Sequence, residues 1–107
     1  MDLAIRLLAR SGKFQELCQT LLALLDTMRN TPGCWECHIY QDMENSEKLV
    51  LSVQWEGVAA LEQYMRSESG GAILGALDLL GETVETRIVK ENPWVGIEAL
   101  KRMRSNL

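Results

Sequence analysis

The sequence predicts a single α+β domain built on a four-stranded antiparallel sheet. Four segments alternate apolar with other side chains, the two-residue period of a strand, and two segments repeat apolar residues every third or fourth position, as helices do. Along the 107 residues their order is strand, helix, strand, strand, helix, strand, then a short tail helix. This is the ferredoxin-like order. We expect one domain over residues 1–107, with its core in residues 3–90 and a C-terminal helical extension in residues 91–107.

The first half of the chain supplies a strand, the first helix and a hairpin. Residues 3–10 alternate in the manner of a strand. Residues 13–30 carry the strongest helical pattern, with an apolar stripe along one face, and Pro32 prevents the helix from continuing. Residues 34–42 and 49–55 alternate again around a polar loop, which predicts a β-hairpin.

The second half supplies another helix and the last strand. The helical pattern begins at Gly57 and ends at Gly81, a residue suited to a helix C-terminus. Within it, the adjacent pair Gly70-Gly71 disfavours helix, so we expect a break or kink there. Residues 83–90 alternate and form the last strand.

A tail helix is predicted to begin at Asn92-Pro93. Asparagine is a good N-terminal cap, and proline suits the first helical turn. Trp94, Ile97 and Leu100 recur at helical spacing and would line one side of this helix.

The two faces of the sheet should differ in character. Right-handed crossovers place both helices on one face, and the more apolar strand residues should point toward them. The opposite face mixes apolar and charged side chains, a composition too apolar for bare solvent and too charged for a core. We therefore expect two copies to pack these faces together in a C2 homodimer. The residues of this face are Arg6, Leu8, Glu36, His38, Tyr40, Val50, Gln54, Glu85 and Arg87.

Composition narrows the classes of function. Hydrophobic residues make up 47% and charged residues 24%, the balance of a globular domain. The net charge of −4 argues against nucleic acid as a partner. No apolar run is long enough to span a membrane, and Arg6 and Arg10 interrupt the first apolar stretch, so neither a membrane partner nor a secretory signal is expected. Cytoplasmic location follows as the default.

The segment Cys34-Trp35-Glu36-Cys37-His38 matches the pattern of c-type haem attachment. Strand alternation would place Cys34 and Cys37 on opposite faces, which fits neither haem attachment nor a tetrahedral zinc site. We expect two small buried hydrophobic side chains and no metal, and a c-type haem protein stays an outlying alternative.

His38 is the only histidine of the chain. Any mechanism that uses an imidazole base near neutral pH must use it, so it is a candidate catalytic residue. The alternative is a structural histidine on the dimer-facing side of the sheet, paired with Glu36 or Glu85.

A ligand pocket is predicted between the sheet and the second helix. Trp55 ends a strand and should point toward the helices, near Tyr64 and Met65, with Cys37 on the same face. Aromatic side chains with few polar groups are typical of pockets for small apolar molecules. Tyr64 is a candidate catalytic residue because its hydroxyl can bind a substrate oxygen. The alternative for Trp55 is plain core packing.

Several short motifs resemble those of one known family, the antibiotic biosynthesis monooxygenase domain, over roughly residues 3–90. They are a strand running into Ser-Gly-Lys in residues 5–13, the Thr31-Pro32-Gly33-Cys34 turn, the Tyr40-x-Asp42 strand end, and Trp55-Glu56 followed by Ala60-Leu61.

This resemblance implies a dimeric α+β barrel and oxidation of phenols or quinols without metal or flavin, so no cofactor is expected. Tyr64 stands where the family often has histidine. The haem-degrading members use an asparagine in the first strand, which is absent here, and a histidine where this chain has Leu74. We therefore expect a cofactor-independent monooxygenase acting on a small aromatic, quinol-like substrate. The alternative is a non-catalytic homodimer of the same fold that binds a small apolar or aromatic molecule.

Overall fold

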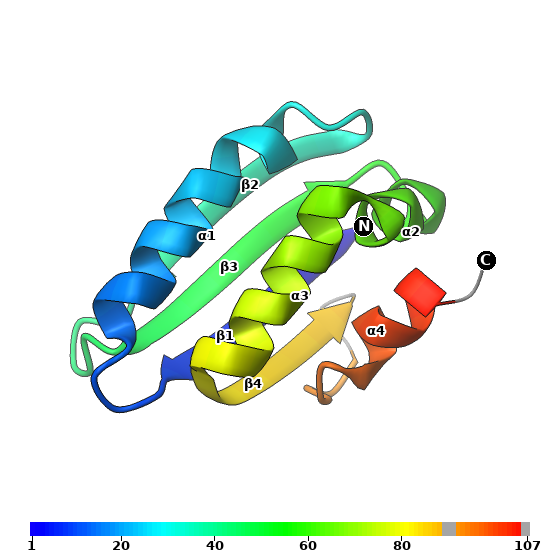
Figure 1. Cartoon of the computed structure of the whole chain (residues 1–107). Helices are drawn as coiled ribbons and strands as arrows, with labels where there is room; N and C mark the ends of the chain where they lie inside the picture. The colour runs from blue at the N-terminus through cyan, green and yellow to red at the C-terminus, as the bar shows by residue number, and fades with distance from the viewer. Residues whose placement is uncertain (89–91, 106–107) are drawn as a thin grey trace.

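A computed structural model describes residues 1–88 and 92–105 of the chain (Figure 1). It contains one four-stranded sheet, two long helices over one face of that sheet, and two shorter helices at one end. The elements are β1 (Asp2–Ala9), α1 (Phe14–Arg29), β2 (Cys34–Gln41), β3 (Lys48–Trp55), α2 (Val58–Arg66), α3 (Glu68–Leu80), β4 (Gly81–Ile88) and α4 (Glu98–Ser105).

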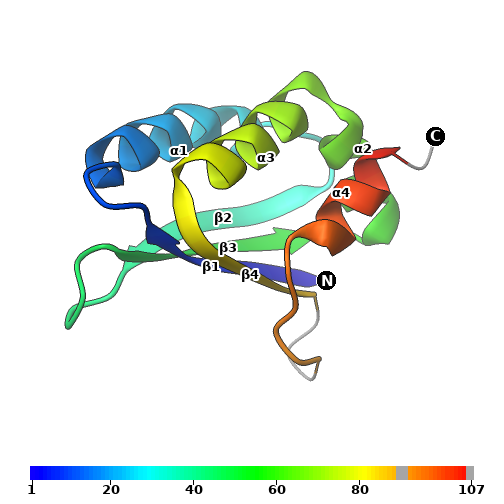
Figure 2. The same cartoon turned by 60° about the horizontal axis from the view of Figure 1, so that its bottom comes forward.

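The strand order is β2-β3-β1-β4, and every neighbouring pair is antiparallel. This confirms the ferredoxin-like α+β fold. Ile5 in β1 lies opposite Leu51 of β3 on one side and Thr86 of β4 on the other. Figure 2 shows α1 and α3 together above the sheet, with the opposite face of the sheet left open.

The core lies between the sheet and these helices. Because side chains alternate along a strand, Leu3, Ile5 and Leu7 point to the helices and are almost fully buried. Each such side chain contributes roughly 1.5–3 kcal/mol through its burial. The largest fully buried side chains around them are Leu17, Val53, Trp55, Leu61, Tyr64, Met65, Ile73, Leu77 and Leu100.

The second helical segment breaks at Ser67, not at Gly70-Gly71 as predicted. Ser67 has an extended backbone, with ψ of 166°, and its Oγ accepts a hydrogen bond from the Gly70 N–H at 3.1 Å, so it caps α3. Both glycines lie inside α3. A Cβ at Gly70 would overlap the Tyr64 carbonyl oxygen, so this glycine permits a close approach of α2 and α3 instead of breaking the helix.

The C-terminal segment also departs from its prediction, because the helix begins at Glu98 and not at Asn92-Pro93. Val95 instead pairs with Thr86 of β4 through two backbone hydrogen bonds of 2.6 and 2.7 Å. The buried positions of Ile97 and Leu100 match the expected inner side of the segment. Of the predicted last strand, residues 89–90 lie outside the described part of the chain.

Trp94 lies outside the helix, where two arginines, one from β1 and one from β4, contact its ring. The guanidinium carbons of Arg6 and Arg87 lie 4.2 and 4.4 Å from the centre of the Trp94 ring. Arg6 and Arg87 belong to the open face of the sheet, so Trp94 covers part of the β1–β4 side of that face.

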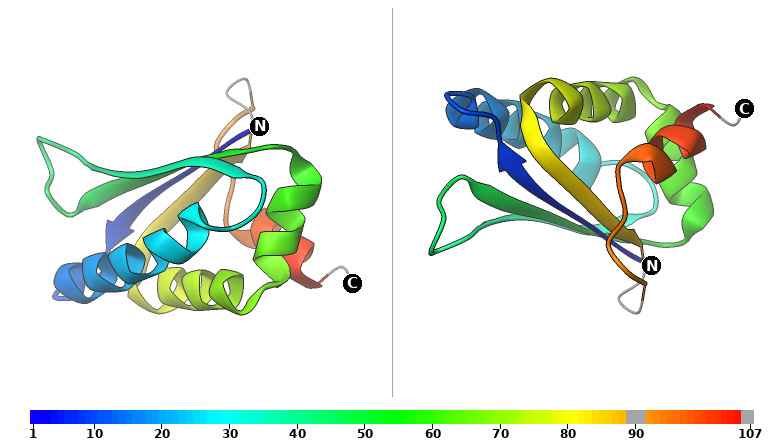
Figure 3. Two further views of the ribbon diagram at one scale, coloured as in Figure 1. Left: turned by 90° about the horizontal axis from the view of Figure 1, so that it is seen from above. Right: turned by 90° about the horizontal axis from the view of Figure 1, so that it is seen from below.

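The tail helix packs at one end of the molecule. Figure 3 shows α4 beside α2, at the end of the sheet away from the β2–β3 hairpin. Among the described residues, no helix combines the length and the apolar content needed to cross a membrane.

Candidate functional site

The predicted site residues fall on two faces of the sheet. Trp55, Tyr64, Met65 and Cys37 lie in the core on the helix side, each at most 1% exposed. His38 follows Cys37 in β2 and therefore points to the open face, where its side chain is 50% exposed. Within one subunit, His38 and Tyr64 cannot act on the same substrate atom.

The helix-side group centres on two aromatic rings. Trp55 ends β3, Tyr64 lies on the inner side of α2, and their ring centres are 5.4 Å apart at an interplanar angle of 37°. The Tyr64 hydroxyl forms a hydrogen bond of 2.8 Å with the hydroxyl of Ser69. Sequence reasoning missed Ser69, and the five-residue spacing carries no signal because the two hydroxyls meet across the break between α2 and α3.

The indole N–H of Trp55 is buried and has no hydrogen-bond acceptor among the described residues. A buried tryptophan N–H normally finds a partner, and leaving it unpaired costs on the order of 1–3 kcal/mol. The interior beside Tyr64 therefore holds one hydrogen-bond donor without a protein partner, on a side chain that is fully buried.

Tyr64 and Ser69 line a cleft of about 520 Å³ between α1, the turn after it and the α2–α3 junction. This volume is within the usual range for small-molecule sites. Leu24 and Ala72 give it apolar walls, and Pro32 belongs to the turn at its edge. An aromatic ring is the chemical group that such a lining accommodates.

Burial raises the pKa of the Tyr64 phenol, and the hydrogen bond with Ser69 offsets only part of that effect. A tyrosine with a raised pKa stays protonated at neutral pH. The Tyr64 hydroxyl can therefore donate a hydrogen bond to a ligand oxygen, but it is not a base that removes a proton.

The structure corrects the predicted placement of Cys34. The register between β2 and β3 shifts between Cys34 and Glu36, so Trp35 is an extra residue of a β-bulge and is 65% exposed. Cys34 pairs with Trp55 and packs against the core. Cys34 and Cys37 therefore both belong to the helix side of the sheet, not to opposite faces.

Neither Cys34 nor Cys37 has the lowered pKa of a reactive thiol. Burial raises the pKa of Cys37 to about 11 and also raises the pKa of Cys34. The Cys37 Sγ lies 3.4 Å from the Met28 sulfur, inside the core, which argues against attachment of a haem at this position. Within residues 1–88 and 92–105, no three His, Cys, Asp or Glu side chains gather as a metal site would need.

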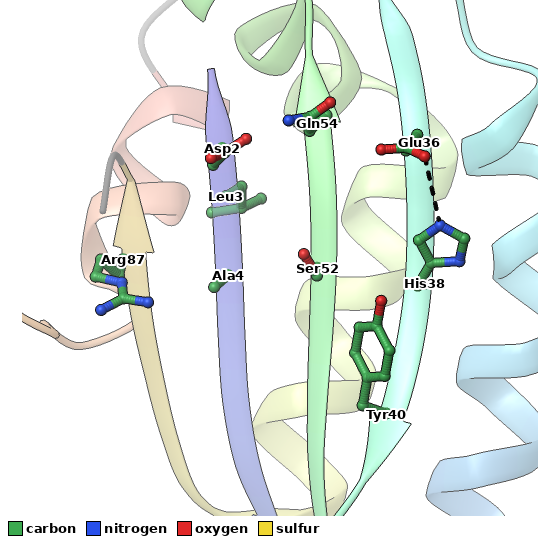
Figure 4. A pocket seen from close by; sticks show the side chains of 9 residues that line it. All are labelled: Asp2, Leu3, Ala4, Glu36, His38, Tyr40, Ser52, Gln54 and Arg87. Carbon is green, nitrogen blue, oxygen red and sulfur yellow. Dashed lines mark ion pairs between the residues drawn. The ribbon is translucent and has the colours of Figure 1, made fainter. Parts of the chain in front are cut away.

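His38 lines a small polar hollow on the open face, of about 210 Å³ (Figure 4). Its Nε2 lies 3.9 Å from Glu36 Oε1, which is the first of its two predicted partners. Glu85 pairs with Arg6 instead, at 2.8 Å. The remaining lining is polar except for Leu3 and Ala4, and Figure 4 places Tyr40 beside His38 and Arg87 at the far side of the sheet.

A second hollow of about 540 Å³ lies beside it on the same open face. Leu8, Val50 and Tyr40 contribute to this hollow, and Tyr40 is 56% exposed. The open face thus carries the mixture of apolar and charged side chains that the strand alternation predicts.

Comparison with known proteins gives the chain a family and a set of structural relatives. The model of the antibiotic biosynthesis monooxygenase family matches residues 3–73. No curated protein sequence matches the chain.

Three solved structures illustrate the likeness. Protein PA3566 from Pseudomonas aeruginosa is 24% identical, with a TM-score of 0.77 over 86% of this chain and 93% of that one. A conserved protein from Methanosarcina mazei Go1 is 23% identical, with a TM-score of 0.78 over 85% and 91%. An antibiotic biosynthesis monooxygenase is 13% identical, with a TM-score of 0.77 over 86% and 98%. At these identities the structures establish the fold.

Proposed function

Because the chain belongs to the antibiotic biosynthesis monooxygenase family, we propose that it is a cofactor-independent monooxygenase acting on a small aromatic, quinol-like substrate. The observation that carries the proposal is the helix-side cleft, which Tyr64 and Ser69, with their paired hydroxyls, line together with apolar side chains. The ring of Trp55 packs behind Tyr64, in the core, and is not among the residues that line the cleft. Such a site binds an aromatic ring and holds its oxygen by hydrogen-bond donors.

The substrate ring would lie against Leu24 and Ala72, with its phenolic oxygen at the Tyr64 hydroxyl. The donor stabilises the phenolate form, which is the electron-rich form that reacts with oxygen. A substrate oxygen that reached the Trp55 N–H would also relieve its missing hydrogen bond. Met65 and Cys37 lie in the core on the same side of the sheet and do not line the cleft.

In this chemistry the substrate itself supplies the electrons. For a ring methylene the balance is CH2 + O2 → C=O + H2O, so one oxygen atom enters the product and the other leaves as water. The protein binds, orients and excludes bulk water. His38 lies on the other face of the sheet and cannot take the phenolic proton. The proton would therefore leave to solvent as the substrate binds. Phenols with a low pKa would be the favoured substrates, because they lose this proton most easily.

We propose for His38 the second of its two roles, as an interface residue of a homodimer. The exposed Tyr40, the neighbouring Val50 and Leu8, and the ring of Trp94 leave the open face more apolar than a solvated sheet surface. Two copies related by a two-fold axis would cover it. Multi-angle light scattering tests this: a dimer mass at micromolar concentration supports it, and a monomer mass contradicts it.

One observation favours the alternative of a non-catalytic binding protein of the same fold. The chain's only histidine is outside the helix-side cleft, so the cleft lacks the base that most often accelerates proton removal. In this alternative the protein is still a homodimer that binds an aromatic ligand, but it does not catalyse a reaction.

One experiment distinguishes the monooxygenase from the non-catalytic binding protein. Oxygen uptake is followed with a panel of naphthols, anthrones and quinols, using protein treated with chelator and checked to be free of flavin. Uptake with one substrate class, lowered by Tyr64→Phe, supports the monooxygenase. Binding without uptake supports the alternative. We also propose a cytoplasmic location and one functional domain over residues 1–107, which the packing of α4 against α2 supports.

A further inference from the structure

We propose that Arg104, in the tail helix α4, is a positioning residue that fixes the α2–α3 junction and with it the hydroxyl pair of Tyr64 and Ser69. The inference rests on the proposed function in so far as this pair is the substrate site. Arg104 lies beyond residues 3–73, the part of the chain that the family model matches.

The contacts of Arg104 are made at the end of α2. Its Nη1 donates hydrogen bonds to the carbonyl oxygens of Met65 and Ser67, each at 2.6 Å. The last carbonyls of a helix have no partner within the helix and carry the negative end of its dipole. The Met65 carbonyl is one of these, whereas the Ser67 carbonyl begins α3 and also accepts a hydrogen bond from the Gly71 N–H at 3.0 Å. A guanidinium, planar and permanently charged, is well suited to bind both carbonyls at once.

The α2–α3 junction determines the positions of both hydroxyls of the site. Ser67 Oγ donates to the Tyr64 carbonyl at 2.5 Å and accepts from the Gly70 N–H at 3.1 Å, so it ties the last turn of α2 to the first turn of α3. Tyr64 lies three residues before Ser67, and Ser69 lies two residues after it. Moving the Ser67 carbonyl therefore changes the distance between the two hydroxyls.

A second observation comes from the other side of the guanidinium. A Cβ built on Gly71 would lie 2.5 Å from Arg104 Nη2 and 2.7 Å from its central carbon. The glycine leaves the space that the guanidinium occupies. The Gly70-Gly71 pair is explained by two close approaches, of α2 at the first glycine and of Arg104 at the second.

The tail helix that carries Arg104 is itself fixed. Leu100 is fully buried, and Lys101 Nζ lies 2.7 Å from an oxygen of Asp78 in α3. Figure 1 shows α4 beside α2 at the end of the sheet. Arg104 thus connects α4 to the end of α2. Because α4 is also held by Leu100 and Lys101, removing the Arg104 side chain should change the structure only at the α2–α3 junction.

The test compares Arg104→Gln and Arg104→Lys with Arg102→Gln, a matched control because Arg102 is an exposed arginine of the same helix. All variants carry Tyr40→Phe, which leaves Tyr64 as the only tyrosine. The hydrogen-exchange rates of the Gly70 and Gly71 amides measure how stable the α2–α3 junction is. The pH at which Tyr64 ionises, followed by ultraviolet absorbance, measures how well its hydroxyl is shielded from water.

We expect Arg104→Gln to speed exchange at Gly70 and Gly71 about tenfold or more, with strand amides unchanged, and to let Tyr64 ionise at lower pH as water reaches it. Arg104→Lys should give an intermediate result, and Arg102→Gln should match the parent. Unchanged exchange and titration in Arg104→Gln overturn the proposal. So does an equal increase of exchange throughout the sheet, which would indicate a merely global role.

Gly71→Ala provides an independent perturbation if Arg104→Gln fails to fold. The added methyl displaces the guanidinium, so the same local changes are expected, and their absence overturns the proposal. Neither readout uses a ligand. If the parent protein neither binds nor oxidises 1-naphthol, the proposed function fails, while exchange and titration still decide the role of Arg104.

Discussion

The hydroxyls of Tyr64 and Ser69 meet at 2.8 Å across a break between two helices. Tyr64 comes from α2 and Ser69 from the first turn of α3, and Ser67 forms the break between them. Because two rigid elements contribute one group each, the spacing of the pair depends on how α2 and α3 are held together. This arrangement places a hydroxyl pair among the residues that line the cleft.

Removing the Tyr64 hydroxyl tests its role in the site. We expect Tyr64→Phe to lower the apparent affinity for a phenolic substrate roughly tenfold and to cost only about 1 kcal/mol of stability, because one neutral hydrogen bond is lost. Isothermal titration and urea unfolding measure the two effects. Tyr40→Phe, on the opposite face of the sheet, is the matched control and should leave affinity unchanged. Equal effects of the two substitutions would remove Tyr64 from the site.

Trp55→Phe probes the inner wall. The smaller ring leaves a void, which should destabilise the protein by about 1–3 kcal/mol in urea unfolding. The loss is moderated because the substitution also removes the unpaired buried N–H. Binding of 1-naphthol should weaken by a larger factor than binding of naphthalene, since only the former has an oxygen to accept the indole hydrogen bond. Equal weakening for both compounds would contradict a donor role for Trp55.

Stability should fall in alkaline solution. Burial raises the pKa of Cys37 from 9.0 to about 11 and also raises that of Tyr64. An acid whose pKa is raised by folding stabilises the native state fully below its unfolded pKa, and this stabilisation is lost as pH rises through the folded pKa. The free energy of unfolding should therefore decline from about pH 9 toward pH 11. In Cys37→Ala this decline should be shallower, and an identical slope would show that the thiol does not contribute.

A charge on the open face should prevent the proposed dimer without unfolding the subunit. Val50 lies on this face in an inner strand, between Arg6 of β1 and Tyr40 of β2, so Val50→Glu should give a monomer by light scattering while its circular dichroism stays that of the parent. Leu22→Glu makes the same change at an exposed position of α1, where Leu22 is 58% exposed, and should remain dimeric. A dimer that persists in Val50→Glu would place the interface elsewhere.

Sequence periodicity was sufficient for the strands, their order and the inner face of the sheet, because burial of one face imposes alternation directly on the residues. The break in the second helix was placed wrongly, since the glycines at positions 70 and 71 serve contacts with Tyr64 and Arg104, which are not local. Cys34 was misassigned because a β-bulge at Trp35 shifts the alternation by one residue and leaves no mark in composition.

The sequence predicted the aromatic residues of the candidate site but not the residues that pair with or position them. Trp55 and Tyr64 could be paired because each lies on the inward side of a strongly patterned element. Ser69 and Arg104 could not, because their contacts depend on how the junction and the tail helix fold back onto the domain. Trp94 was placed in the tail helix because helical spacing with Ile97 and Leu100 gives no sign of its contacts with Arg6, from a strand distant in sequence, and Arg87.

The most direct test of the central claim is where a small aromatic molecule binds. Titration of isotope-labelled protein with 1-naphthol, followed by amide NMR, should shift the signals of Tyr64, Ser69 and Ala72 around the cleft. The signals of His38 and Ser52, which line the hollow on the opposite face, should stay in place. Shifts confined to that opposite face, or none at any concentration, would contradict a helix-side site.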